Sequence, residues 1–410
     1  MESIQPKKVS EEIKEILQHA DLNTCLTCGT CAGGCAVSGI LGDLEGWDIR
    51  KVLRKLVYGM VDEVVDSKFP WVCTICGRCM YACPMKVDIV HIMELMKALR
   101  PRDKVPGVLH KGTEKALATG NNMGIPEAVY FQVLEMVEEE LREEEGFADF
   151  KLPIDKDGAD VAFYPNSKEI SADSDDMKWY WKIFYASGAD WTIPKDNWEA
   201  VDWGLFTANE EASMTLARRK IDFVKKHNIK RLILPDCGGG SFGCRLGLEK
   251  WKGKDANLSI DYLYIYDIII EYLKQGRIKV DKSKNTKLHT WHDSCKHGRV
   301  AEQFFGQGKY DEPRWILEQC TDNFVEMHPT RANSFCCGAG GGAWAGPYKE
   351  ERNYYGRKKA EAIKNSGAEV VVVGCSNCRD QILRGLKPKY NLDIEVKYIW
   401  QIIAESLVME

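Results

Sequence analysis

Two cysteine quartets with the same internal spacing lie in the N-terminal quarter of the chain. They read CLTCGTCAGGC and CTICGRCMYACP, and each follows the pattern C-x2-C-x2-C-x3-C. Such a run wraps a [4Fe–4S] cubane, and cysteines serving only as buried apolar residues would not repeat so regularly. The pattern therefore predicts two cubanes, which carry electrons one at a time. The eight predicted ligands are Cys25, Cys28, Cys31, Cys35, Cys73, Cys76, Cys79 and Cys83.

The fourth cysteine of each run usually ligates the other cluster. Residues 47–65 and 87–99 carry apolar side chains at helical spacing, and a further helix is expected to begin at Ser10. Residues 1–100 are thus predicted to form a helical, ferredoxin-type domain with two cubanes. Crossed ligation places one cubane on Cys25, Cys28, Cys31 and Cys83, and the other on Cys73, Cys76, Cys79 and Cys35.

A second cysteine set follows predicted strands near the C-terminus, in HDSCKHGR, SFCCGAGGG and GCSNCRD. The carboxyl ends of parallel strands meet at one edge of a sheet, so these thiols should converge. Five thiols exceed the needs of Zn²⁺ or a cubane, and a vicinal pair favours a multi-iron cluster with a bridging thiolate. The glycines after the pair leave room for a substrate. The predicted ligands are Cys295, Cys336, Cys337, Cys375 and Cys378.

These strands belong to an internal repeat of about 120 residues within the last part of the chain. Each half alternates strands with helices and closes on a short strand running into an apolar helix, YLYIYDIIIEYLKQG or VKYIWQIIAESL. Alternation of this kind favours parallel α/β layers. We predict an α+β multidomain fold with two pseudo-symmetric α/β lobes at residues 159–286 and 287–410. A connector at residues 101–158 includes a helix over 126–145 that ends in a solvated acidic run.

Composition restricts the class of protein further. With 61 acidic against 56 basic residues the net charge is −5, which argues against nucleic acid as a partner. No segment approaches 18 uninterrupted apolar residues, and no basic stretch followed by an apolar one opens the chain. Neither a membrane span nor a secretory signal is therefore expected. The sixteen cysteines fit thiolates that are kept for metal in a reducing cytoplasm.

Together the two motif sets carry a family resemblance. The run C-x(n)-CCG-x(n)-C-x2-C resembles the CCG domain of heterodisulfide reductases, and the whole chain resembles the D subunit of that enzyme. The resemblance implies a helical two-cubane ferredoxin domain fused to a CCG domain. It also implies that the five cysteines hold a non-cubane [4Fe–4S] cluster at which disulfides are cleaved or formed.

The first lobe departs from the family pattern, so we expect no cluster there. A single intact CCG motif is more similar to the cytoplasmic subunits of sulfate-reducer membrane complexes. These include the K subunit of the sulfite-reduction-associated complex and subunits of complexes built around multihaem cytochromes c. In the first lobe, Asn166 and Ser167 stand in place of the leading cysteine, and Asp202, Trp203 and Gly204 stand in place of CCG. The closing C-x2-C keeps only Cys237, with Gly240 at its second position and Cys244 nearby.

Several residues near the predicted centres have open roles. The five cysteines and His292 are the predicted catalytic residues. His292 and His297 could each donate a proton to a departing thiolate or orient the loop. Lys296 and Arg299 could offset negative charge at the cluster or a substrate, or face solvent. Cys237 and Cys244 could form a redox pair, bind a partner's sulfur or be relics of the repeat. Cys320 and most tryptophans of residues 179–203 are expected in the core, while some of these tryptophans could form a docking face.

The leading hypothesis is an iron–sulfur electron-transfer subunit of a membrane redox complex in an anaerobe. Electrons would pass between a haem-b or quinone membrane subunit, the cubanes and the five-cysteine cluster, for thiol–disulfide chemistry on a protein or small thiol. The protein would attach peripherally to the inner face of the cell membrane. One alternative is an electron wire without bond chemistry. Another is the iron–sulfur subunit of a glycolate- or lactate-oxidising complex, to which the CCGAGGG motif corresponds less well.

Overall fold

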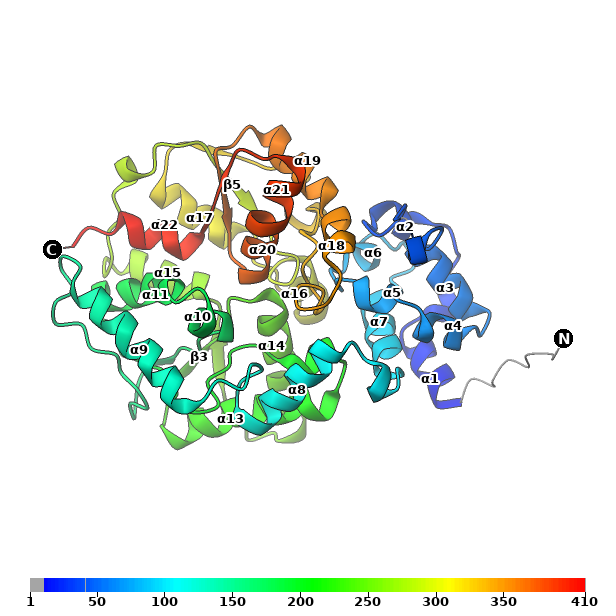
Figure 1. Cartoon of the computed structure of the whole chain (residues 1–410), viewed down its shortest axis with the longest axis horizontal. Helices are drawn as coiled ribbons and strands as arrows, with labels where there is room; N and C mark the ends of the chain where they lie inside the picture. The colour runs from blue at the N-terminus through cyan, green and yellow to red at the C-terminus, as the bar shows by residue number, and fades with distance from the viewer. Residues whose placement is uncertain (1–10, 41, 410) are drawn as a thin grey trace.

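The N-terminal part of the chain forms a helical unit at one end of the molecule (Figure 1). The computed structural model describes residues 11–40 and 42–409, so Ser10, the expected helix start, lies outside the described residues. The helices are α1 (Glu11–His19), α2 (Thr30–Gly34), α3 (Ile49–Val57), α4 (Val61–Asp66), α5 (Phe69–Val72), α6 (Arg78–Tyr81) and α7 (Ile89–Ala98).

The single helix predicted over residues 47–65 is wrong, because the chain forms α3 and α4 there. The Asp48 carboxylate caps α3 by accepting a hydrogen bond of 2.8 Å from the backbone of Lys51. Gly59 then adopts a φ of 76° between the two helices, a left-handed conformation that costs glycine little. The turn lets Val52 and Val64 both reach the core, where each is fully buried.

The connector consists mainly of α8 (Gly107–Thr119) and α9 (Glu127–Arg142), which pack along the lobes (Figure 1). The acidic run at the end of α9 is only partly solvated. Glu140 forms an ion pair of 2.9 Å with Lys178, and Glu144 forms a second ion pair with Lys182 on the same neighbouring helix. The run therefore helps to fasten the connector to the first lobe.

Each lobe is built on a four-stranded parallel sheet. The strand order is β2-β1-β3-β4 in the first lobe and β6-β5-β7-β8 in the second. The corresponding strands of the two repeats therefore stand in the same order. This equivalence confirms the predicted repeat and the α+β fold class. The strands are β1 (Val161–Ala162), β2 (Trp191–Thr192), β3 (Arg231–Ile233), β4 (Asp261–Leu263), β5 (His289–His292), β6 (Phe324–Val325), β7 (Val370–Val373) and β8 (Glu395–Tyr398).

Helices surround both sheets. In the first lobe they are α10 (Ser167–Ser171), α11 (Asp175–Ala186), α12 (Trp203–Phe206), α13 (Glu210–Lys226), α14 (Gly238–Lys254) and α15 (Ile265–Lys274). In the second lobe they are α16 (Arg299–Phe305), α17 (Asp311–Cys320), α18 (Lys349–Tyr355), α19 (Arg357–Ser366), α20 (Ser376–Asp380), a π-helical turn (Gln381–Leu386), α21 (Lys387–Tyr390) and α22 (Ile399–Ser406).

The two lobes pack against each other through aromatic and charged contacts. The rings of Tyr180 and Trp400 stack with centroids 4.9 Å apart, and Lys168 forms an ion pair of 2.7 Å with Asp380. Trp181, Trp191 and Trp198 are buried, as predicted for this aromatic-rich segment. Within the described ranges, no helix combines the length and apolar character that a membrane crossing needs.

Candidate metal centres

The two cysteine quartets adopt matching loop conformations. Thr27 and its counterpart Ile75 have φ values of 50° and 47°, and Gly29 and Gly77 have φ values of 89° and 72°. Left-handed residues at equivalent positions turn the backbone so that successive thiols face inward. The same local sequence spacing has therefore produced the same kind of cage twice.

The thiols gather in two groups. Cys25, Cys28, Cys31 and Cys83 line one cavity, and Cys35, Cys73, Cys76 and Cys79 line another. These are the sets expected from crossed ligation, while ligation itself stays a prediction. Burial raises the pKa of the Cys31 thiol to about 11, and the neighbouring Cys25, Cys83 and Cys28 add to the rise. Such crowding of thiols suits iron, because a metal would displace the protons that these sulfurs otherwise hold.

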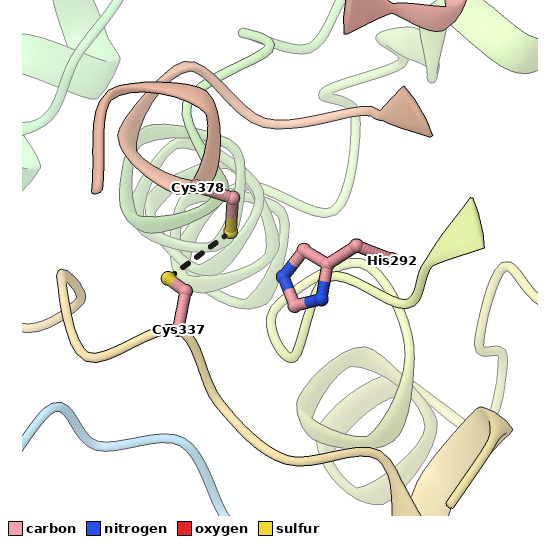
Figure 2. Close-up of side chains that lie close together, drawn as sticks. All are labelled: His292, Cys337 and Cys378. Atoms are coloured by element: carbon pink, nitrogen blue, oxygen red, sulfur yellow. Dashed lines mark hydrogen bonds between the residues drawn. The ribbon is translucent and has the colours of Figure 1, made fainter. Parts of the chain in front are cut away.

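The five cysteines of the second lobe come together at the carboxyl edge of its sheet. Cys295 follows β5, the vicinal pair lies on the loop before α18, and Cys375 and Cys378 stand at the start of α20 after β7; all five are buried. The sulfurs of Cys337 and Cys378 are 3.4 Å apart. Figure 2 shows the imidazole of His292 beside this pair, with the three donor atoms within 4.8 Å of one another.

Hydrogen bonds among these thiols shift their pKa values in opposite directions. Bonds from Cys336 and Cys378 hold the pKa of Cys337 well below its ordinary value. The pKa of Cys336 is raised well above it by hydrogen bonds to Cys295 and Cys337. Close-packed thiols that share protons in this way form a donor set that a multi-iron cluster fits, because the metal replaces the shared protons.

Buried cations surround the five-cysteine site, so the alternative that Lys296 and Arg299 face solvent is wrong. The Lys296 ammonium lies 4.1 Å from the ring centroid of Phe242 and has no hydrogen-bond partner in the described part of the chain. Burial lowers its pKa, and it also lowers the pKa of Lys359 to about 8. Cations at this position offset the negative charge of thiolate-bound iron.

The helix that follows Cys237 also points at this site. The backbone N–H of Gly238, the first residue of α14, donates a hydrogen bond of 3.1 Å to the Cys375 sulfur. The partial positive charge at a helix N-terminus favours a thiolate there. The first lobe therefore contributes to the site of the second.

The two histidines near Cys295 have different surroundings. His297 Nδ1 is 3.0 Å from the Tyr266 hydroxyl, and burial lowers its pKa to about 3. A neutral, hydrogen-bonded ring of this kind suits an orienting role. Neither ring nitrogen of His292 has a hydrogen-bond partner among the described residues, and burial lowers its pKa as well. His292 lies beside Cys337, and its role as a proton donor stays a prediction.

The glycine-rich loop after the vicinal pair packs directly on the second quartet. A Cβ at Gly340 would lie 2.7 Å from the Thr74 carbonyl oxygen, and one at Gly341 would lie 2.8 Å from that of Cys73. The Thr74 hydroxyl is 3.5 Å from the Cys336 sulfur. The second cubane cage and the five-cysteine site are thus immediate neighbours.

Two contacts at this junction could not be predicted from the sequence. The Tyr355 hydroxyl lies 3.2 Å from the Cys76 sulfur, and Arg299 donates a hydrogen bond of 2.7 Å to the Cys76 carbonyl oxygen. No local pattern indicated either contact, because each joins the second lobe to the N-terminal domain.

A cavity of about 480 Å³ lies where α8, the first lobe and the glycine-rich loop of the second lobe meet. Its walls include Cys237, Asn377, Gly342 and Trp344. The Asn377 amide donates a hydrogen bond of 3.2 Å to the Cys237 sulfur. Asn377 stands between the ligand candidates Cys375 and Cys378 in the sequence, so the cavity adjoins the five-cysteine site, although none of the five cysteines lines it.

The altered positions of the first lobe serve its own backbone. The Asn166 side chain caps α10, and the Asp202 carboxylate caps α12 while accepting a hydrogen bond of 3.0 Å from the Ser213 hydroxyl. Cys244 is buried within α14, and Cys320 is buried at the end of α17 as expected for a core residue. Side chains engaged in capping support the expectation that this lobe holds no cluster.

Family models match both halves of this arrangement. A 4Fe-4S dicluster domain matches residues 21–87, and a cysteine-rich domain, CCG, matches residues 289–382. The Hdr-like menaquinol oxidoreductase iron-sulfur subunit 2 of Archaeoglobus fulgidus is 23% identical, over 95% of this chain and 80% of its own. The D subunit of the dihydromethanophenazine:CoB–CoM heterodisulfide reductase of Methanosarcina barkeri is 23% identical, over 95% of each chain.

An uncharacterized iron-sulfur protein of Methanocaldococcus jannaschii is 25% identical, over 96% of this chain and 75% of its own. These matches confirm the resemblance that the cysteine motifs indicated. The dicluster domain accounts for two [4Fe–4S] cubanes, and the CCG domain adds a further iron–sulfur site. The chain is therefore an iron–sulfur protein that resembles the D subunit of heterodisulfide reductases over nearly its whole length.

Proposed function

We propose that this protein is the iron–sulfur electron-transfer subunit of a membrane-associated oxidoreductase complex, with thiol–disulfide chemistry at its five-cysteine site. The observation that carries the proposal is the contact between the second cubane cage and that site, where the Thr74 hydroxyl lies 3.5 Å from the Cys336 sulfur. Cages in contact support rapid electron transfer through the chain. When bound, the clusters would supply single electrons, and the five-cysteine centre would also bind sulfur.

The chain's own residues provide the remaining requirements of such a site. The cavity beside Cys237 has room for a thiol or disulfide, and its wall includes Asn377, which stands between two of the five cysteines in the sequence. Lys296 and the N-terminus of α14 favour negative charge at the site. We assign to His292, a neutral ring beside Cys337, the relay of a proton to a departing sulfur, since disulfide cleavage needs protons as well as electrons.

The names of two relatives support the membrane assignment. One is called a subunit of a menaquinol oxidoreductase, and the other a subunit of a heterodisulfide reductase that uses dihydromethanophenazine. We assign the quinol step to a haem-b membrane subunit, with this chain attached peripherally at the inner face of the membrane. A multihaem cytochrome c complex is a further candidate partner. The other substrate would be a small protein or thiol that carries the reacting sulfur.

The test is electron paramagnetic resonance of the anaerobically purified protein, together with an iron count. Three clusters' worth of iron and an oxidised-state signal that changes on adding a thiol would support the proposal. Cys337→Ala should lose the thiol-sensitive signal. Its control, Cys320→Ala, removes a thiol that is buried away from the site and should keep that signal.

The other results have definite meanings. Two clusters' worth of iron in a fully loaded protein, with no oxidised-state signal, would contradict a cluster at the five-cysteine site. A signal that appears but ignores every thiol and disulfide would instead favour a pure electron wire.

A further inference from the structure

Two neighbouring hollows lie on the surface around the first quartet, at the outer end of the N-terminal domain. One hollow is lined by Cys28, Leu26 and Met85 among others, and the next has a volume of about 440 Å³ along α3. Arg50 lines both, so they form one continuous surface, called here the outer face. Figure 1 shows α3 at the end of the molecule far from the two lobes.

The outer face is unusually apolar for a solvent-exposed region. Leu26 and Tyr58 are each 65% exposed, Met60 is 44% exposed and Met85 is 37% exposed. A single exposed apolar side chain is ordinary, but a group of them marks a place where another molecule binds.

The same face is basic although the whole chain is acidic. Arg50, Lys51 and Arg54 are exposed along α3, against a net charge of −5 for the protein. Asp48 is the one carboxylate among the described residues that line the α3 hollow, and its oxygen caps the helix. Lys55 pairs with Glu63 and therefore adds little net charge. A partner that matches this face must present negative charge.

The outer face also lies where electrons can leave or reach the molecule. Cys28 alone among the sixteen cysteines, all of which the structure describes, is exposed. The second quartet and the five-cysteine site lie deeper, with Cys76 and Cys336 buried. A one-electron centre seated over Cys28 would therefore be closer to the first cubane cage than to the deeper cages.

We infer that the outer face is the docking surface for an acidic redox protein or subunit that exchanges single electrons with the first cubane. Its carboxylates would pair with Arg50, Lys51 and Arg54, while Leu26, Tyr58 and Met85 form the apolar contact. One electron passes from the reduced partner to the oxidised cubane, and no bond or proton changes. The inference rests on the proposed function only for the cubanes and is independent of the thiol chemistry.

A charge reversal on α3 tests this inference in the full, iron-loaded chain. The probe is an acidic plant-type [2Fe–2S] ferredoxin, reduced by a laser flash, with electron transfer followed by absorbance. Lys51→Glu with Arg54→Glu should lower the second-order rate about tenfold or more at low salt. Raising the salt should slow the unaltered protein and should not slow the variant, because salt screens attraction in the first and repulsion in the second.

The control places the same charge change on the first lobe, where Lys225 and Lys226 are exposed near the end of α13. Lys225→Glu with Lys226→Glu should leave the rate within about twofold of the unaltered protein, since these charges are remote from the outer face. Reduction by a neutral deazaflavin radical should be equal in all three proteins. This readout shows that the cubanes are intact even if the site proves inert toward thiols.

Two results would overturn the inference. One is a ferredoxin rate that is insensitive to both salt and the α3 reversal. The other is a rate that is unchanged by the reversal, while binding to vesicles of anionic phosphatidylglycerol is lost. That second result would make the outer face a lipid-binding surface.

Discussion

At the scale of single residues, the cluster cages depend on hydrogen bonds that reach sulfur from outside the ligand loops. The Tyr355 hydroxyl, 3.2 Å from the Cys76 sulfur, belongs to the second lobe although Cys76 belongs to the N-terminal domain. Hydrogen bonds to cluster sulfurs tune the reduction potential of iron–sulfur centres. The CCG lobe would therefore influence a cubane held by Cys76 as well as its own site.

Removing this hydroxyl should lower the potential of the second cubane. The hydroxyl donor stabilises the reduced cluster, which is the more negative state. Tyr355→Phe deletes this donor and keeps the ring that fills the core. The measurement is a redox titration followed by paramagnetic resonance. Tyr354→Phe is the matched control, because the Tyr354 hydroxyl contacts the Ser38 carbonyl oxygen at 3.5 Å instead of a thiol. Equal potentials in both variants would contradict the prediction.

At the scale of elements, glycines decide how closely the CCG loop approaches its neighbours. Residues 349–366 form two helices instead of one, because the helix breaks at Gly356, where α18 ends and α19 begins. A Cβ at this position would lie 2.5 Å from the Cys337 carbonyl oxygen and 2.5 Å from Leu386. The break therefore accommodates the vicinal cysteines, and helical periodicity alone could not reveal it.

Gly356→Ala should destabilise the protein by about 1–3 kcal/mol through overpacking and disturb the five-cysteine site. The expected result is a lower thermal midpoint and a weakened oxidised-state signal. Gly253→Ala, in α14, is the control, because its added Cβ meets nothing within 4 Å. Alanine is the better helix former, so this control should match or exceed the original stability. A Gly356 variant as stable as the control would show that the loop can move away.

At the scale of the whole molecule, the lobes are held together beside the cavity by ion pairs from both halves. Lys168 of the first lobe donates to Asp380 at 2.7 Å and to the Asn377 side chain at 2.9 Å. Asp380 is 1% exposed, so removing Lys168 leaves this buried carboxylate with the more distant Arg379, 3.4 Å away, and makes its charge costlier to keep. The contact links the inter-lobe packing to the residue between Cys375 and Cys378.

Lys168→Met should therefore cost about 1–3 kcal/mol and reduce the response of the five-cysteine signal to thiols. Lys156→Met removes an exposed ion pair of 2.7 Å with Asp190 and should cost only about 0–1 kcal/mol. Thermal unfolding under anaerobic conditions compares the two variants. Equal midpoints would mean that the Lys168 pair contributes no more than a surface pair.

The sequence by itself determined the cages and the repeat. Ligand spacing within each quartet is a local property, and left-handed residues at Gly29 and Gly77 follow from that local run. The strands of both lobes could be predicted because alternating apolar segments also reflect nearby residues. The boundaries of the connector and lobes, set at residues 100, 158 and 286, stay predictions.

Only the tertiary structure decided how the cages connect. The Thr74–Cys336 and Cys76–Tyr355 contacts join residues separated by 262 and 279 positions. The inter-lobe cavity likewise combines Cys237 with Asn377 from the other lobe. Such contacts arise from the packing of whole domains, where many weak interactions select one arrangement. Spacing along the chain thus specified which thiols act together, and folding specified what each group faces.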